Sequence, residues 1–322
     1  MENASSSSVF DCVVVGAGIS GLMAAARLQN EGYSCIVLDK GRGVGGRMAT
    51  RRLEEGKCDH GAQFFTVSDD RFAGYVDKWK ELGLVFPWFG EEEGRIRYRA
   101  HPGMTGIAKY LAKDLNIKLS FKVDAVSRED ELWSVSAAGE TVQGRSVLMT
   151  CPVPQAVDVL EGSSIELDPK LMKDLKQVKY RKAQVAMLRL DGPSGIASPG
   201  FIKLKSGGPL DVISDNQQKG VSESTTVTVH SSHDFADEFF DKSKELVLER
   251  LVAEAKPYLK SNIVETSYHR WGFAHRVGES DKHFAMDISK KLWFSGDSFG
   301  QAKVEGAALN GLAVAESIAV HI

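Results

Sequence analysis

The glycine pattern Gly16-Ala-Gly18-Ile-Ser-Gly21 directly follows a short β-branched run and opens a segment of helical composition. Gly16 permits a tight turn, Gly18 lets backbone amides approach a pyrophosphate at a helix N-terminus, and Gly21 allows close packing of helix on strand. Asp39, at the end of the next apolar run, can accept hydrogen bonds from ribose hydroxyls. Together these features predict a dinucleotide-binding site; a glycine-rich turn without a ligand is the alternative.

An arginine- and glycine-rich segment, residues 41–52, comes immediately after this region. Its glycines let the backbone crowd a ligand. The arginines offer fork-shaped donors suited to phosphate or carboxylate, and they are Arg42, Arg47, Arg51 and Arg52. A solvated basic loop is the alternative for any one of them, but the position beside Asp39 favours ligand binding by the group.

A second glycine-carboxylate turn, Gly296-Asp297, follows the apolar run 292–295 near the C-terminus and precedes an alanine-rich helical segment. Asp297 can bind sugar-alcohol hydroxyls, and a helix from about Gly306 can point its positive end at the N1/C2=O edge of a flavin. A nicotinamide-only Rossmann domain does not need this closing segment, so it favours FAD. Plain capping of the helix is the alternative.

The elements that must position these residues can be read from composition and periodicity. A strand (10–15), a helix (22–30) and a strand (35–38) make a βαβ unit at the start of the chain. Residues 119–150 read as a three-stranded meander, and the middle third reads as an antiparallel sheet with hairpins. The two ends therefore belong to one class and the middle to another.

We therefore predict an α/β protein with a Rossmann-like FAD-binding domain and an inserted α+β substrate domain on a mixed or antiparallel sheet. The FAD-binding domain is expected to be discontinuous. It comprises residues 9–70, 102–160 and 272–322, and the substrate domain comprises 71–101 and 161–271.

Composition excludes several classes of protein. The 322 residues are 43% hydrophobic and 26% charged, which is typical of a globular protein, and the net charge of −3 does not attract nucleic acid. The four cysteines are too few for a disulfide framework, residues 1–8 lack the features of a signal peptide, and the apolar run 13–26 is too short to cross a bilayer. We expect a cytoplasmic protein that binds neither nucleic acid nor membrane, as a monomer or a dimer.

Six stretches resemble the renalase family, a branch of the FAD-dependent amine-oxidase-like flavoproteins. They are residues 13–21, 39–50, 59–66, 101–105, the region of Trp271, and Gly296-Asp297. The resemblance implies a glutathione-reductase or amine-oxidase type of fold with non-covalent FAD. It also implies oxidation of the 2- and 6-dihydro isomers of NAD(P) to β-NAD(P)⁺, with O₂ reduced to hydrogen peroxide.

The resemblance also implies site residues. On the substrate side, the catalytic candidates are Asn216, His230 and Trp271. The cofactor-binding set, from motif and resemblance together, is Gly16, Gly18, Ile19, Ser20, Gly21, Asp39, Lys40, Arg42, Gly46, Arg47, Met48, His60, Gly61, Ala62, Gln63, Val123, Gly296, Asp297, Val304, Glu305, Gly306 and Ala307. For His230 a satisfied semi-buried histidine is the alternative, and for Trp271 a core tryptophan. No metal is expected, because a strand would place His230 and His233 on opposite faces and no third ligand has matching spacing.

Other functions remain open at this point. An amine oxidase would need an aromatic cage, for which Trp271 and Phe273 are the candidates, and a dinucleotide-binding protein without turnover would need neither. A short-chain dehydrogenase is excluded, since no tyrosine is followed four positions later by lysine. The aromatic run 86–89 is expected to be a turn packed into the core of the smaller domain.

Overall fold

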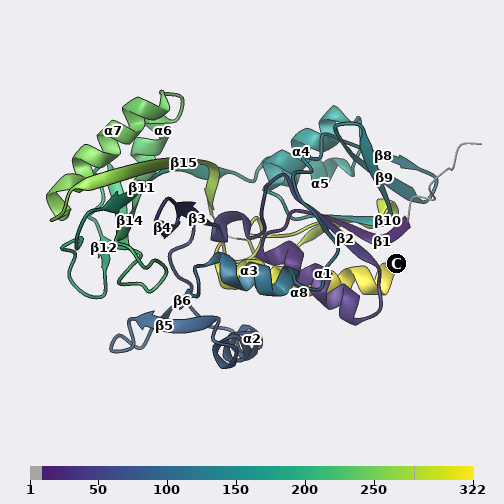
Figure 1. The fold of residues 1–322 in the computed structure, drawn as a ribbon. Helices are drawn as coiled ribbons and strands as arrows, with labels where there is room; N and C mark the ends of the chain where they lie inside the picture. The colour runs from purple at the N-terminus through teal and green to yellow at the C-terminus, as the bar shows by residue number, and fades with distance from the viewer. Residues whose placement is uncertain (1–8, 279) are drawn as a thin grey trace, which may run out of the picture. The chain divides into compact units, whose positions relative to one another are not determined.

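The computed structural model describes residues 9–278 and 280–322, which fall into two units (Figure 1). Unit 1 comprises the described parts of 1–46, 108–179 and 278–322, and unit 2 comprises 47–107 and 180–277. Residues 1–8, for which the sequence predicts no signal peptide, lie outside the described residues.

Unit 1 is built on an eight-stranded sheet whose main strand order is β16-β17-β10-β1-β2-β7, with β9 paired to β10 and β8 to β9. Five strands are parallel to one another: β1 (Val9–Val15), β2 (Cys35–Leu38), β7 (Ile117–Lys118), β10 (Glu140–Met149) and β17 (Leu292–Phe294). The antiparallel additions are β8 (Ala125–Glu129), β9 (Leu132–Ala137) and β16 (Ala285–Asp287). The meander expected over residues 119–150 is therefore present as β8, β9 and β10.

Helices cover both faces of this sheet. Along β1, Val13 and Val15 pack into one apolar cluster while Cys12 and Val14 pack into the other, because successive side chains of a strand point to opposite faces. One face carries α4 (Val153–Gly162) and α5 (Pro169–Lys176); the other carries α1 (Ile19–Asn30) and α8 (Val304–His321), which lie side by side in Figure 1. The remaining helical elements are η3 (Ile288–Lys290) and α3 (Thr105–Ala112), of which residues 108–112 belong to this unit. This arrangement confirms the predicted Rossmann-like α/β architecture.

Unit 2 is built on a five-stranded, wholly antiparallel sheet of order β12-β13-β14-β11-β15. Its strands are β11 (Tyr180–Leu190), β12 (Phe201–Lys203), β13 (Leu210–Asp215), β14 (Thr226–Ser231) and β15 (Ile263–Arg276). Two hairpins join it, β3 (Thr50–Leu53) with β4 (Gly56–Asp59) and β5 (Val85–Phe89) with β6 (Arg97–Ala100). The helical elements are η1 (Gly46–Met48), α2 (Asp70–Glu81), α6 (His233–Phe239), α7 (Lys244–Ala255) and η2 (Lys256–Tyr258). The expected antiparallel substrate domain is thus present.

The unit boundaries differ from the predicted domain boundaries. Residues 47–70 belong to unit 2 because the β3–β4 hairpin packs Leu53 and Cys58 against β11. Residues 161–179 belong to unit 1 because α5 buries Leu175 in the core that it shares with α4. Residues 272–276 belong to unit 2 because β15 continues through them without a break.

Two local expectations also need correction. His233 is not on a strand with His230, because Ser232 caps the start of α6 by accepting a hydrogen bond from the amide of Phe235 (3.3 Å). The aromatic run 86–89 is strand β5 rather than a turn, since it pairs with β6. Across the residues that the structure describes, no helix has the length and apolar character needed to span a membrane.

Candidate functional site

Only glycine fits at two positions near the carboxyl end of β1, one in the turn that follows the strand and one in the first turns of α1. Gly16 has a φ of 120°, and a Cβ there would lie 2.6 Å from Thr150 Oγ1. A Cβ on Gly21 would lie 2.1 Å from the carbonyl oxygen of Gly16, because α1 packs directly on the turn. These two glycines are therefore explained by the protein's own packing.

Gly18 is different, because a Cβ at this position would meet nothing within 4 Å and its φ of −75° suits any residue. It is the N-cap of α1, and no side chain caps that helix end. The side chains of Ile19 and Ser20 are buried, so a ligand here would meet backbone amides. An open, uncapped helix N-terminus next to a tight turn fits the pyrophosphate of a dinucleotide.

We predict that Gly21→Ala lowers stability, whereas Gly162→Ala, at a helical position where a Cβ meets nothing within 4 Å, does not. The clash with the Gly16 carbonyl should cost about 1–3 kcal/mol, the usual range for overpacking. Urea unfolding of both variants measures this. Equal midpoints for Gly21→Ala and wild type would contradict the packing explanation.

Asp39 ties the glycine turn to the loop that follows it. Its Oδ2 accepts a hydrogen bond from the amide of Ala17 and its Oδ1 one from the amide of Gly41, both at 2.6 Å. The amide of Gly45 in turn donates to the carbonyl of Ala17 (2.8 Å), which folds the loop back over the turn. Each carboxylate oxygen keeps a further lone pair for a ribose hydroxyl. Asp39 therefore has a structural role in addition to the predicted one.

The C-terminal segment joins the same unit beside the glycine turn. A Cβ on Gly311 of α8 would lie 2.3 Å from the carbonyl oxygen of Ser20, and the Oγ atoms of Ser20 and Ser295 are 3.4 Å apart. Asn310 Nδ2 donates to the carbonyl of Gly296 at 2.9 Å. Both ends of the chain thus contribute to one region, as the sequence predicts.

The other residues of unit 1 that are predicted to contact the cofactor differ in their exposure to solvent. Arg42 and Lys40 are exposed, and Lys40 Nζ donates to Gln155 Oε1 at 3.2 Å. Val123 is buried in the core cluster that includes Val13 and Val15. The first turn of α8 holds Val304, Glu305, Gly306 and Ala307, and all of these but Val304 are buried. Contact of these residues with FAD stays a prediction.

Two of the four arginines of the basic loop bind the backbone of β15 within unit 2. Arg47 Nη1 donates to the carbonyl of Phe273 (3.1 Å), and Arg51 Nη1 donates to that of Tyr268 (3.0 Å). Met48, between them, is buried. Two guanidinium groups of this segment therefore have a structural role at the β-sheet, and contact of the segment with a ligand stays a prediction.

Two buried polar atoms of segment 59–63 have no hydrogen-bond partner among the described residues. Gln63 Nε2 donates to the carbonyl oxygens of Asp59 (2.7 Å) and Gly61 (3.0 Å). Gln63 Oε1 and His60 Nδ1 are buried and have no hydrogen-bond partner within the part of the chain that the structure describes. Buried polar atoms of this kind fit a bound ligand, and their contact with a cofactor or a substrate stays a prediction.

His60, His269 and Trp271 form a compact polar-aromatic cluster in unit 2. The His60 ring is stacked on Trp271 with centroids 5.5 Å apart, and His269 lies 4.7 Å from His60 and 4.1 Å from Trp271. Trp271 Nε1 donates to the carbonyl of His60 (2.8 Å). Burial lowers the pKa of His60 to about 3 and that of His269 to about 4, so both are neutral near pH 7. His269 was not predicted; its spacing of two from Trp271 on one strand is the signal that could have found it.

His230, on β14, and Asn216, in the turn that follows β13, both contact this segment. His230 Nε2 lies 3.1 Å from Gln63 Nε2, and burial lowers the pKa of His230 to about 3, so its imidazole is neutral near pH 7. Asn216 is fully buried, accepts from the Asp59 amide (3.1 Å) and donates to Thr228 Oγ1 (3.0 Å). Asn216 therefore positions the segment, and its contact with a substrate stays a prediction.

A buried ion pair, absent from the sequence-based expectations, anchors the segment. Lys219 Nζ lies 2.7 Å from Asp59 Oδ2, and both side chains are 0% exposed. Asp59 Oδ1 accepts from Thr50 Oγ1 (2.5 Å) and from the Met104 amide (2.9 Å). Burial lowers the pKa of Lys219, and the carboxylate of Asp59 opposes that shift. The pair fixes the start of the segment that carries His60 and Gln63.

The neutral histidines predict how stability depends on pH. Their pKa values are about 3 to 4 in the folded protein, against an ordinary value of 6.5, so the unfolded chain binds more protons between these limits. Stability from these groups is therefore full above pH 6.5 and is lost as the pH falls toward 4. Urea midpoints from pH 8 to 4 measure this slope. His269→Gln should flatten it and the exposed control His321→Gln should not; identical slopes in both variants would contradict the assignment.

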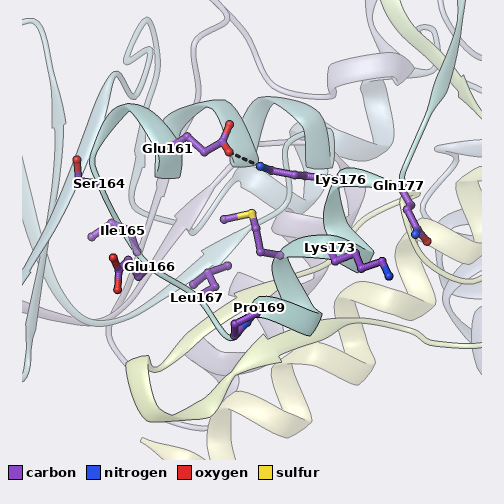
Figure 2. A pocket seen from close by; sticks show the side chains of 10 residues that line it. Glu161, Ser164, Ile165, Glu166, Leu167, Pro169, Lys173, Lys176 and Gln177 are labelled. Carbon is purple, nitrogen blue, oxygen red and sulfur yellow. Dashed lines mark ion pairs between the residues drawn. The ribbon is translucent and has the colours of Figure 1, made fainter.

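Unit 1 also has a surface pocket of about 780 Å³, formed by α4, α5 and the loop that joins them (Figure 2). Its wall includes Ile165, Leu167 and Met172, and the ion pair between Glu161 and Lys176 (2.5 Å) spans its rim. None of the predicted site residues lines it.

Two family profiles match the chain. One, described as an NAD(P)-binding Rossmann-like domain, matches residues 14–79. The other, described as a flavin containing amine oxidoreductase, matches residues 81–319, which is well over half of the chain.

Individual relatives match over shorter stretches. An L-amino acid dehydrogenase of Synechocystis is 38% identical over 74 residues, or 23% of this chain and 16% of the relative. A flavin-containing amine oxidase B of Sus scrofa is 40% identical over 93 residues, or 29% of this chain and 17% of the relative. The matched stretch thus spans about a sixth of each relative.

Among solved structures, the fold is similar to a putative protoporphyrinogen oxidase from Exiguobacterium, with a TM-score of 0.75, 14% identity and coverage of 98% of this chain and 100% of that one. It is also similar to a putrescine oxidase, with a TM-score of 0.72, 17% identity and coverage of 97% and 99%. At these identities the likeness concerns the fold alone.

Proposed function

The chain belongs to the family of flavin-containing amine oxidoreductases, and from this premise we propose that it oxidises the 2- or 6-dihydro isomers of NAD(P) to β-NAD(P)⁺. Family membership confirms two of the predictions made above, an FAD-dependent oxidoreductase and FAD as its cofactor. When bound, FAD supplies the hydride acceptor and hands the electron pair to O₂, which yields hydrogen peroxide. The renalase-type substrate and the O₂ step are the proposal.

In this proposal, unit 1 binds the dinucleotide cofactor. The open N-terminus of α1 at Gly18 receives the pyrophosphate, and Asp39 receives a ribose. Gly296 and Asp297, held beside α1 by α8, receive the flavin end of the cofactor. These roles use backbone amides and carboxylates that the local fold already orients.

The neutral cluster of His60, His269 and Trp271 carries the proposal for the substrate. A dihydronicotinamide becomes an aromatic cation when it loses hydride, so the reaction needs close placement of a ring carbon more than it needs a protein base. The flat rings of the cluster supply a surface for a planar heterocycle, and the two imidazoles remain uncharged near pH 7. Positioning is therefore the main task of these side chains.

The amine-oxidase alternative has weaker support from the geometry. Trp271 and Phe273 would have to form a cage, but Trp271 packs against His60 and His269 while Phe273 packs edge-on against Tyr180 at 5.7 Å. The two rings thus belong to different ring clusters. Amine oxidation and dinucleotide binding without turnover are kept as outcomes of the experiment.

Anaerobic mixing of the holoprotein tests the proposal. The protein is mixed separately with 6-dihydro-NAD, β-NADH and a panel of amines while the oxidised flavin band is followed. We expect rapid bleaching by the dihydronicotinamide isomer. Bleaching by amines alone would replace the proposal with the amine oxidase, and no bleaching by any of these compounds would favour a binding protein.

A further inference from the structure

Asn310, on α8, is 1% exposed and binds both ends of the turn 296–299, which follows β17 in unit 1. Its Nδ2 donates to the carbonyl oxygen of Gly296 at 2.9 Å and to that of Phe299 at 2.7 Å. The backbone bond within the turn, from the Phe299 amide to the Gly296 carbonyl, is longer at 3.3 Å. Asn310 therefore binds the turn at shorter distances than the turn's own backbone bond.

Three neighbours fix the orientation of the Asn310 amide. Its nitrogen donates to two carbonyl oxygens, and reversing the amide would place its oxygen against both of these acceptors. Oδ1 therefore faces His283, whose Nδ1 lies 2.8 Å away. Because an amide oxygen can only accept, His283 donates from Nδ1. Both polar atoms of the amide are thus bonded to other residues of unit 1.

The turn 296–299 lies beside the glycine turn that follows β1. A Cβ on Gly296 would lie 3.3 Å from the carbonyl oxygen of Thr150, and Thr150 Oγ1 donates to the carbonyl oxygen of Gly16 at 3.0 Å. The strands β1, β10 and β17 are parallel, so their carboxyl ends share one edge of the sheet. Ligands of open α/β sheets bind at this edge. Asp297, the second residue of the turn, therefore lies at the edge where a dinucleotide is expected.

We propose that Asn310 is a positioning residue for FAD, whose amide holds residues 296–299 in the conformation that presents Asp297 to the cofactor. The inference rests on the proposed function for the role of Asp297. It adds a residue that acts through the turn, since both of its amide polar atoms are bonded to protein, and it assigns to His283 the support of that amide from the other side.

Asn310→Asp tests this role with almost no change of shape. The carboxylate keeps an acceptor for His283 but places an oxygen against the carbonyl oxygens of Gly296 and Phe299. We expect the dissociation constant for FAD, measured by titrating the apoprotein, to rise at least about tenfold, because two carbonyl groups lose their donor. At saturating FAD, the visible circular dichroism of the bound flavin should also change. A wild-type dissociation constant with an unchanged spectrum would overturn the inference.

Ser146→Ala is the control for a loss of stability alone. Ser146 is 0% exposed in the same unit, and its Oγ donates to the carbonyl oxygen of Asp11, in the first half of β1, at 2.7 Å. We expect this variant to lower the urea midpoint of the apoprotein but to keep the wild-type dissociation constant and flavin spectrum. If it weakened FAD binding as much as Asn310→Asp does, the effect would be one of stability and the inference would fail.

Gly300→Ala disturbs the same amide from outside α8, and it decides the question if Asn310→Asp does not fold. Gly300 has a φ of 54°, and a Cβ there would lie 3.0 Å from Asn310 Oδ1 and 3.3 Å from Nδ2, so the amide must shift. We expect a smaller rise in the same dissociation constant. Gly139→Ala, also at a positive φ (85°) but with nothing within 4 Å of the Cβ, should bind FAD as wild type does. Equal affinities of these two variants would count against the positioning role.

These outcomes are separate from failure of the proposed function, because they measure FAD binding without turnover. If dihydronicotinamide isomers do not bleach the flavin, yet Asn310→Asp binds FAD weakly and Ser146→Ala does not, then the reaction is wrongly assigned and the positioning role stands. If bleaching of the wild type is rapid but Asn310→Asp binds FAD as wild type does, the reaction stands and the positioning role is wrong.

Discussion

Gly18→Leu is expected to abolish FAD retention while the protein still folds. A Cβ at this position meets no atom of the protein within 4 Å, and the backbone conformation suits any residue, so we expect the folded chain to accept leucine. The same side chain would fill the open space at the N-terminus of α1, where a pyrophosphate must approach the backbone amides. We expect the affinity for FAD to fall at least about 100-fold, or roughly 3 kcal/mol.

Flavin content and stability are measured separately for this prediction. The purified variant is titrated with FAD, and the urea midpoint of the apoprotein is compared with that of wild-type apoprotein. Gly162→Leu serves as the control, since it adds the same side chain at another open position of unit 1. If Gly18→Leu kept wild-type FAD affinity, the cofactor would have to be held elsewhere. A large drop in apoprotein stability would instead show that the space is needed for folding.

Lys219→Met is expected to have the largest effect on stability. The substitution leaves the fully buried carboxylate of Asp59 without its cation, and the donors that remain among the described residues are the hydroxyl of Thr50 and the amide of Met104. Breaking a buried ion pair in this way typically costs about 3–5 kcal/mol. Because Asp59 begins the segment that carries His60 and Gln63, any folded fraction should also show weakened ligand binding.

The control for the buried pair is an exposed one on the same unit. Lys203 is paired with Asp211 on the surface, so Lys203→Met should change the free energy of unfolding by less than about 1 kcal/mol. The double variant Lys219→Met with Asp59→Asn should recover part of the loss, since it removes the unpaired charge. Equal effects of the two lysine substitutions on urea unfolding would refute the importance of burial.

The cofactor turn could be predicted because its determinants are local. Gly16, Gly18 and Gly21 act through backbone dihedral angles and close approach within one strand-turn-helix unit, and their spacing of two and then three residues is visible in the sequence. The same holds for Asp168, which caps α5 by accepting from the Leu171 amide at 2.9 Å, and for Pro257, which follows the end of α7. Periodicity and capping are properties of neighbours along the chain.

The unit boundaries and the ligand-recognition cluster could not be predicted in this way. Arg47 and Arg51 read as free donors in the sequence, yet they bind carbonyl groups of a strand more than two hundred residues later. Similarly, nothing near Lys219 in the sequence indicates a buried charge, since its partner Asp59 lies on a different hairpin. A charged or polar residue acquires its role from what the fold places beside it.

The amino-acid sequence by itself determined the class of the protein: a strand, three glycines and a carboxylate specify a dinucleotide turn because each acts on backbone only a few residues away. Tertiary structure alone decided which histidines are neutral and which arginines bind the backbone of the β-sheet. It also decided which buried polar atoms of segment 59–63 have no partner among the described residues. Burial and pairing join residues that are distant along the chain, and hydrogen-bond satisfaction can be counted only when those residues have been brought together.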